Sequence, residues 1–136
     1  MAAVAVDYRV QGEGPPLYMV HGIGSRKVTW DGLMPQLTPY FTCVSYDLRG
    51  HGHSPVAAPP YSLDDLVEDL EALRVKLGHE RVHVVGHSLG GMIGPAYARA
   101  YPDRVCSLGL LSTAAGRSDD ERDNLIALIG KMERGG

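Results

Sequence analysis

Several features that would assign a protein to a broad class are scarce in this sequence of 136 residues. No apolar run comes near the roughly 18 residues that a membrane helix requires. The net charge is only −3, with both signs scattered, which argues against a nucleic-acid-binding face or a polybasic membrane contact. The apolar start carries no basic stretch before Asp7, unlike a secretory signal. With 44% hydrophobic and 21% charged residues, the composition is globular rather than disordered or fibrous.

Cysteine is also scarce, because the chain contains only Cys43 and Cys106. Both lie in apolar runs that are typical of buried strands. We therefore expect two buried, reduced thiols that pack as small hydrophobic groups, rather than a disulfide. Reduced thiols favour a cytoplasmic location.

What the sequence does contain is an alternation of apolar strand-like runs with helical patterns. The expected strands are residues 4–10, 17–20, 41–46, 82–85 and 105–111, and the expected helices are residues 30–37, 63–77 and 90–100. Ser62 and Gly78 are the expected caps of the second helix, and Pro35 is compatible only with a first helical turn. This order predicts an α/β fold with a mostly parallel sheet covered by helices on both faces.

The most informative motif is Gly86-His87-Ser88-Leu89-Gly90, which lies between an expected strand and an expected helix. A G-x-S-x-G sequence in this position holds its serine on a sharp turn, with the hydroxyl above the sheet. The glycines two residues before and after the serine avoid a clash where strand and helix meet, and Gly91 is expected to extend that close approach. We predict that Ser88 is a nucleophile, and that the N–H of Leu89 stabilises negative charge on a bound carbonyl oxygen.

A second motif, His21-Gly22-Ile23-Gly24, follows the expected strand at residues 17–20. Acyl transfer needs two donors aimed at the oxyanion, and the second comes from such a neighbouring loop. We predict that the N–H of Ile23 is this donor. A flexible turn between strand and helix is the alternative interpretation.

Together with the segment Asp47-Leu-Arg-Gly-His-Gly-His-Ser54, these motifs resemble the α/β-hydrolase superfamily in order and spacing. The resemblance extends from Val6 to about Thr113, and within the superfamily the sequence is similar to the enol-lactonase, carboxylesterase, C–C bond hydrolase and perhydrolase branches. The serine at position 88 argues against the dehalogenase and epoxide-hydrolase branches, which use an aspartate nucleophile. The resemblance also implies that the segment after Tyr46 is structural, with Asp47 and Arg49 bonded to local backbone.

A serine nucleophile needs a base and an orienting acid, which in this family follow the serine along the chain. No histidine follows Ser88. The histidines all precede it, at positions 21, 51, 53, 79, 83 and 87. None is a credible base, and the best placed of them, His21, is expected to tie down the oxyanion loop. We therefore expect the base and the acid to come from outside this sequence.

The resemblance further implies that the fold is truncated at the start of a lid. Residues 1–113 would form the amino-terminal part of the core, and residues 114–136 the beginning of the lid, including an amphipathic helix at 125–132. The strand at 105–111 would then be an exposed apolar edge, which favours association. We expect a complementary carboxy-terminal fragment or self-association, and a monodisperse monomer would contradict this.

The resulting hypothesis is a cofactor-free and metal-free serine hydrolase of carboxylic esters or lactones, nearly inactive as this chain alone. A C–C bond hydrolase or a perhydrolase would use the same residues. A non-catalytic ligand-binding or signalling member, or an inactive fragment, belongs to another class. Ser25, Trp30 and Met92 are candidates to line the acyl pocket, although each could equally be core packing.

Overall fold

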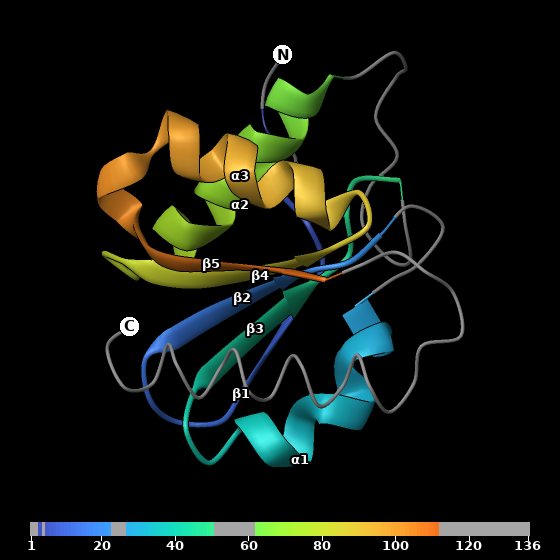
Figure 1. Cartoon of the computed structure of the whole chain (residues 1–136), viewed down its shortest axis with the longest axis vertical. Helices are drawn as coiled ribbons and strands as arrows, with labels where there is room; N and C mark the ends of the chain where they lie inside the picture. Colours follow the sequence, from blue (N-terminus) through green and yellow to red (C-terminus); the bar gives the residue numbers. More distant parts are fainter. Residues whose placement is uncertain (1–2, 4, 23–26, 51–61, 112–136) are drawn as a thin grey trace.

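A five-stranded sheet with helices on both faces forms the framework of the protein. A computed structural model describes residues 3, 5–22, 27–50 and 62–111. The strands are β1 (Tyr8–Gln11), β2 (Pro16–Val20), β3 (Thr42–Tyr46), β4 (Val82–His87) and β5 (Val105–Leu111). One face is covered by α2 (Leu63–Leu77) and α3 (Gly90–Ala100), and the other by η1 (Lys27–Leu33) and α1 (Met34–Leu37) (Figure 1). The short helix η2 (Pro102–Arg104) leads into β5. The predicted fold class is confirmed.

The strand order is β1-β3-β2-β4-β5. Strands β2, β3, β4 and β5 run parallel to one another, whereas β1 pairs antiparallel with β3. β1 begins at Tyr8, later than the expected strand at residues 4–10. The carboxyl ends of parallel strands meet at one edge of a sheet, where ligands bind in open α/β folds. The segments after β2, β3 and β4, which carry His21, Asp47 and Ser88, therefore start from the same edge.

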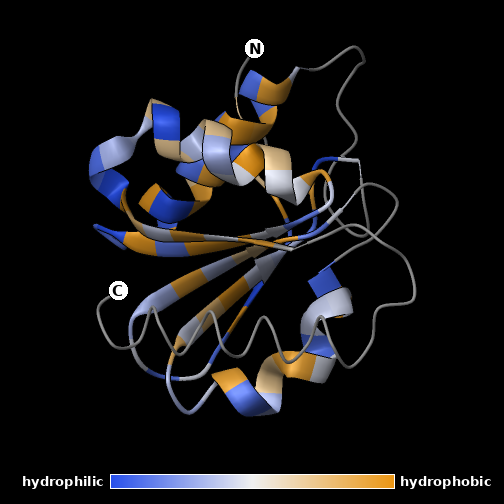
Figure 2. Cartoon of the chain, in the orientation of Figure 1, coloured by the Kyte–Doolittle hydropathy of each residue, from blue (hydrophilic) through white to orange (hydrophobic). Residues whose placement is uncertain are grey.

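Two apolar clusters form the core, one on each side of the sheet. The larger cluster joins β2, β3 and β4 to α2 and α3, and the smaller one joins the sheet to η1 and α1. Figure 2 shows hydrophobic residues recurring along the strands and in both helical layers. Helix α2 turns an apolar face to the sheet, since Leu66, Val67, Leu70 and Leu73 are buried and Leu63 and Leu77 pack beside them.

Helix α2 begins and ends at the predicted residues. The N–H of Asp65 donates to the Ser62 hydroxyl at 3.3 Å, and the carboxylate of Asp65 accepts from the N–H of Ser62 at 2.9 Å. This reciprocal pair is a capping box, and it satisfies two donors that the first turn would otherwise leave unpaired. At the other end Gly78 has a φ of 78°, the left-handed conformation that glycine adopts most readily.

Replacing Ser62 by alanine should lower the free energy of unfolding by about 1 kcal/mol, because the N–H of Asp65 loses its side-chain acceptor. Urea denaturation followed by circular dichroism measures the effect. Ser62→Asp is the control, since aspartate caps helices as well as serine does. Equal stability of Ser62→Ala and the unchanged protein would contradict the predicted contribution of the cap.

The segment expected to be one helix at residues 30–37 is instead two short elements. A 3₁₀ helix, η1, is followed by the single turn of α1, in which Pro35 lies in the first turn as predicted. Pro35 has no N–H to donate to a preceding turn, so a continuous α-helix through this position is disfavoured. None of the helices in the described ranges combines the length and the apolarity that crossing a bilayer demands.

The prediction of two buried thiols is right for Cys43 and wrong for Cys106, and neither cysteine forms a disulfide. Burial raises the pKa of Cys43 to about 11, which keeps this thiol unreactive. Cys106 is exposed because the register between β4 and β5 shifts at the start of β5: Val82 faces Val105 and His83 faces Ser107. Cys106 is therefore left without a residue opposite it on a strand that is, in the described part of the chain, the edge of the sheet.

The expected lid segment at residues 114–136 and its helix at 125–132 lie outside the described residues. Of the predicted core, the end at residues 112–113 also lies outside them. The boundary between core and lid therefore remains a prediction.

Candidate active site

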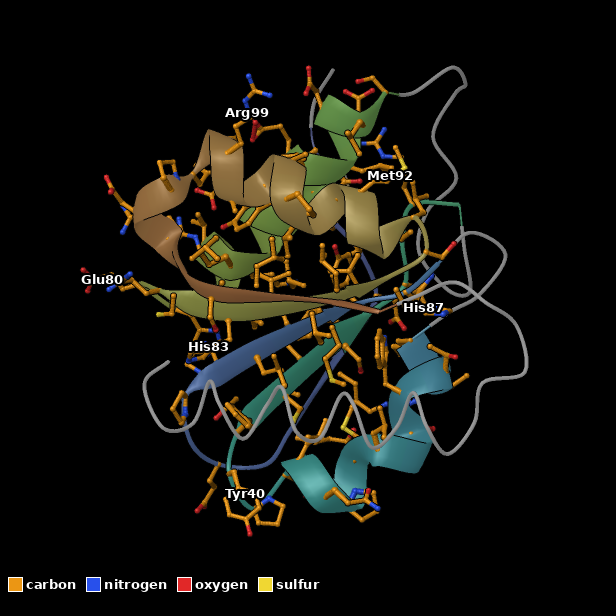
Figure 3. All side chains as sticks on the ribbon, viewed as in Figure 1. Tyr40, Glu80, His83, His87, Met92 and Arg99 are labelled. Atoms are coloured by element: carbon orange, nitrogen blue, oxygen red, sulfur yellow. The ribbon has the colours of Figure 1, made fainter. Side chains whose placement is uncertain are left out.

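Ser88 occupies a sharp turn between the end of β4 and the start of α3. Its φ is 61°, and it is the only non-glycine residue with positive φ among those that the structure describes. Such a conformation is strained for an L-residue and occurs preferentially at functional positions. Figure 3 shows His87, the preceding residue, at the end of β4 where the strands meet the turn. The predicted geometry of this turn is confirmed.

Two of the three neighbouring glycines are required by this geometry. A Cβ at Gly86 would lie 2.0 Å from the carbonyl oxygen of Gly90, and one at Gly90 would lie 2.0 Å from the carbonyl oxygen of Val20. The interpretation of Gly91 was wrong, because a Cβ there would meet only the Gly86 oxygen, at an ordinary 3.9 Å. Strand β4, the turn and the neighbouring β2 thus approach one another so closely that side chains are excluded at residues 86 and 90.

The second motif lies directly beside the serine. A Cβ placed on Gly22 would be 2.7 Å from the Ser88 Cβ and 3.2 Å from its Oγ. Ile23 and Ser25 lie outside the described residues, so their predicted roles remain predictions. Leu89 is the residue immediately before α3, and its backbone dihedral angles are already helical. The N–H groups at a helix start have no acceptor within the helix, which suits Leu89 to the donor role predicted for it.

His21 is fully buried and holds the start of this segment in place. The backbone N–H of Leu48 donates to Nε2 of His21 at 3.0 Å, so Nε2 carries no proton. Nδ1 then carries the proton and donates to the carbonyl oxygen of Gly22 at 2.7 Å. Both ring nitrogens are engaged with backbone groups, which confirms the predicted structural role and leaves His21 unsuited to accept a proton from Ser88.

His79 and His83 give no base either. Nδ1 of His79 lies 2.6 Å from the Tyr18 hydroxyl, and Nδ1 of His83 lies 2.5 Å from the Ser107 hydroxyl. Burial lowers the pKa of both imidazoles. Figure 3 shows His83 and His87 at opposite ends of β4, so His83 is remote from the turn. His51 and His53 lie outside the described residues.

The segment after β3 is structural, as predicted, but its bonds reach further than expected. Asp47 is fully buried and accepts the backbone N–H of Lys27 at 2.6 Å and the Lys27 ammonium at 3.1 Å. Arg49, also fully buried, donates from Nε and Nη2 to both carboxylate oxygens of Asp69 in α2, at 2.7 and 2.8 Å. The expectation that Arg49 binds local backbone was therefore incomplete, because its carboxylate partner lies 20 residues away.

The sequence analysis did not identify Lys27 and Asp69 as residues that form buried ion pairs. A signal for Asp69 was present: it lies on the otherwise apolar face of α2, where a carboxylate requires a buried cationic partner. No comparable signal marked Lys27, because its partners come from distant segments.

The two described candidates for the acyl pocket differ in position. Trp30 is 3% exposed and packs with Met19 and Val85 in the smaller cluster, and its indole N–H has no hydrogen-bond partner in the described structure. Met92 is 60% exposed and lies one helical turn after Ser88, on the part of α3 that faces away from the sheet in Figure 3. Core packing therefore accounts for Trp30, whereas it does not account for Met92.

Within the described ranges, no group of three or more His, Cys, Asp or Glu side chains is arranged to hold a metal ion.

Comparisons with known proteins agree with this fold. The family model described as "alpha/beta hydrolase fold" matches residues 15–132. A fluoroacetate dehalogenase of Burkholderia sp is 40% identical over 113 residues, covering 79% of this chain and 37% of that protein. Among solved structures, a marine microorganism esterase is 27% identical with a TM-score of 0.77, covering 96% of this chain and 51% of that one. The enol-lactonase from Burkholderia xenovorans is 31% identical with a TM-score of 0.74, covering 76% and 41%. The chain spans about a third of the length of the curated relatives it matches.

Proposed function

Because this chain belongs to the α/β-hydrolase family, we propose that it is the nucleophile-bearing part of a cofactor-free serine hydrolase of carboxylic esters or lactones. The observation that carries the proposal is the φ of 61° at Ser88, in a turn enclosed by Gly22, Gly86 and Gly90. A serine that only linked a strand to a helix would not need this strained backbone conformation. Nor would it need glycine at the neighbouring positions 22, 86 and 90.

In the proposed reaction, the Ser88 hydroxyl oxygen attacks the carbonyl carbon of the ester while its proton passes to a base. The N–H groups of Leu89 and Ile23 hold the oxyanion of the tetrahedral intermediate. The alcohol leaves with a proton from the conjugate acid of that base, and an acyl-enzyme on Ser88 remains. Water then attacks the acyl-enzyme, which releases the carboxylic acid and restores the serine.

The identity of residue 88 supports ester or lactone chemistry over dehalogenation, although a fluoroacetate dehalogenase is among the relatives. A dehalogenase of this family displaces halide with an aspartate carboxylate, and position 88 carries a hydroxyl. Two of the similar structures are an esterase and an enol-lactonase, which supports ester or lactone hydrolysis as the reaction. C–C bond hydrolysis and perhydrolysis use the same groups, and the substrate distinguishes them.

We also propose that the base and acid are supplied by a carboxy-terminal segment that packs beside β5. In the described part of the chain β5 pairs only with β4, and Leu110 on this edge strand is 52% exposed. An exposed apolar edge favours addition of a further strand. Self-association through the same edge is the alternative.

A fluorophosphonate probe tests both parts of the proposal. We expect Ser88 to be labelled when the carboxy-terminal segment is present, and labelling to be slower by several orders of magnitude with this chain alone, because no base deprotonates the hydroxyl. Peptide mapping by mass spectrometry locates the label, and intact-mass analysis identifies the companion. Failure to label with the companion bound would favour a ligand-binding role. A monodisperse 14.7 kDa monomer would contradict the proposed partner.

A further inference from the structure

Lys27, four residues after the predicted donor Ile23, forms an ion cluster with Asp7 and Asp47. The Lys27 side chain is 9% exposed, and its ammonium nitrogen lies 3.1 Å from Oδ2 of Asp47 and 2.5 Å from Oδ2 of Asp7. The Asp47 side chain is 1% exposed and that of Asp7 43%. The backbone joins the two aspartates, because the N–H of Asp47 donates to the Asp7 carbonyl oxygen at 2.9 Å.

Asp47 holds Lys27 at two points. Its Oδ1 accepts the backbone N–H of Lys27 at 2.6 Å, and its Oδ2 accepts from the ammonium group of the same residue. An ion pair that served only to neutralise charge would need the second contact alone. The hydrogen bond from the backbone N–H of Lys27 to Oδ1 of Asp47 fixes the main chain of residue 27. The pair therefore sets the position of the backbone where η1 begins.

The ammonium group of Lys27 is stabilised in its charged form. The hydrogen bond to Asp7 holds the pKa of Lys27 above its usual value, and outweighs the opposing effect of burial. A buried ammonium is tolerated only when it is paired in this way. Lys27 therefore remains a charged ammonium group at neutral pH, where it can donate to both aspartates.

The residues that precede Ile23 are attached to the same place. Leu48, the residue after Asp47, donates its N–H to His21, and His21 in turn binds the carbonyl oxygen of Gly22, which lies against Ser88. The described residues on either side of positions 23–26 are thus bound to consecutive residues that follow β3: His21 to Leu48, and Lys27 to Asp47. Arg49, next in the chain, joins this point to Asp69 of α2 by two hydrogen bonds.

We infer that Lys27, clamped by Asp7 and Asp47, is a positioning residue that sets the carboxyl end of the segment carrying the oxyanion donor. The inference rests on the proposed function, since it concerns the donor of that reaction. Displacing a catalytic group by about 1 Å can lower a rate on the order of 100-fold, and losing one oxyanion donor lowers kcat by about 100- to 1,000-fold.

Ester hydrolysis by the active protein, with its carboxy-terminal segment, tests the inference. We expect Lys27→Met to lower kcat by about 10- to 100-fold with KM changed less than about threefold, because an interaction realised mainly in the transition state is weakened. Lys27→Arg keeps the charge and should retain kcat within about fivefold. Arg9→Met is the matched control, since it removes a cation from an exposed ion pair with Asp31 and should leave both constants unchanged.

The readouts separate positioning from simple stabilisation. A Lys27→Met protein that melts at a lower temperature yet keeps its kcat per probe-titrated site would overturn the inference. If Lys27→Met does not fold, Asp7→Asn replaces it, because Asp7 is partly exposed and its loss leaves the Asp47 contacts in place. A smaller fall in kcat, again with KM little changed, supports the inference, and an unchanged kcat overturns it.

A second measurement does not depend on activity. Hydrogen exchange at the backbone N–H of residue 27, which donates to Asp47, should be faster in Lys27→Met than in Arg9→Met after correction for the intrinsic rate, and equal protection in the two variants would overturn the inference. Failure of the proposed function looks different: the unsubstituted protein would then show neither hydrolysis nor labelling, while the difference in exchange would persist.

Discussion

Ser88→Ala is expected to lower kcat of the active hydrolase by on the order of a million-fold, with KM changed little. Alanine removes the oxygen that forms the acyl-enzyme and leaves the backbone N–H of Leu89 in place to bind the substrate. Initial-rate measurements on a chromogenic ester check the result. The fluorophosphonate label should disappear as well, since no other described residue combines a serine hydroxyl with the strained geometry of this turn.

Ser107→Ala is the matched control for this experiment. Ser107 is also half-buried and lies 2.5 Å from a histidine nitrogen, that of His83, so proximity to an imidazole alone would make it a rival nucleophile. It lies in β5 opposite His83, however, whereas Ser88 follows the other end of β4. We expect Ser107→Ala to keep its activity. If Ser88→Ala kept more than about 1% of the activity, or if Ser107→Ala lost it, the assignment of the nucleophile would be wrong.

Gly90→Ala is expected to lower the free energy of unfolding by about 3 kcal/mol or more, or to prevent folding. The new methyl group would lie 2.0 Å from the Val20 carbonyl oxygen and 2.7 Å from its carbon, which are main-chain atoms of a central strand. Such atoms cannot rotate aside as a flexible side chain would, so β2 and α3 must separate. Chemical denaturation of the purified variant, or its partition into inclusion bodies, measures the effect.

The next residue provides the matched control. Gly91→Ala makes the same chemical change one position further along α3, where the nearest atom is 3.9 Å away. We expect this variant to be as stable as the unsubstituted protein or more stable by about 0.5–1 kcal/mol, because alanine favours the helix. Similar losses in both variants would show that helix geometry, rather than contact with β2, explains the glycine at position 90.

Features of the fold that depend on neighbouring residues in the chain were predicted well from sequence. Helix α2 begins at Ser62 and ends at Gly78 as expected, because capping depends on groups within one turn of each other. The sharp turn at Ser88 was likewise predicted, since a strand, two spaced glycines and a helix must meet within five residues. Within this turn the glycine at position 91 was misread, because its freedom from contact depends on how α3 leaves the sheet.

Features that depend on distant segments could not be predicted in the same way. The exposure of Cys106 follows from a register shift between β4 and β5, which no pattern inside β5 reveals. The pairing of Arg49 with Asp69, and of Lys27 with Asp7 and Asp47, joins residues about 20 positions apart. Charge alone does not select one partner among the 16 acidic residues of the chain. The burial that makes these pairs necessary arises only when the helices close over the sheet.

The sequence by itself determined the α/β fold class, the caps of α2 and the strained turn at Ser88, because local sterics and hydrogen bonding within a few residues dictate them. Only the tertiary structure decided that both ring nitrogens of His21 form hydrogen bonds with backbone groups. It likewise decided that Lys27 binds Asp47. Those arrangements require the ends of β2, β3 and β4 to meet at one edge of the sheet. Strand order, rather than any motif, brings them together.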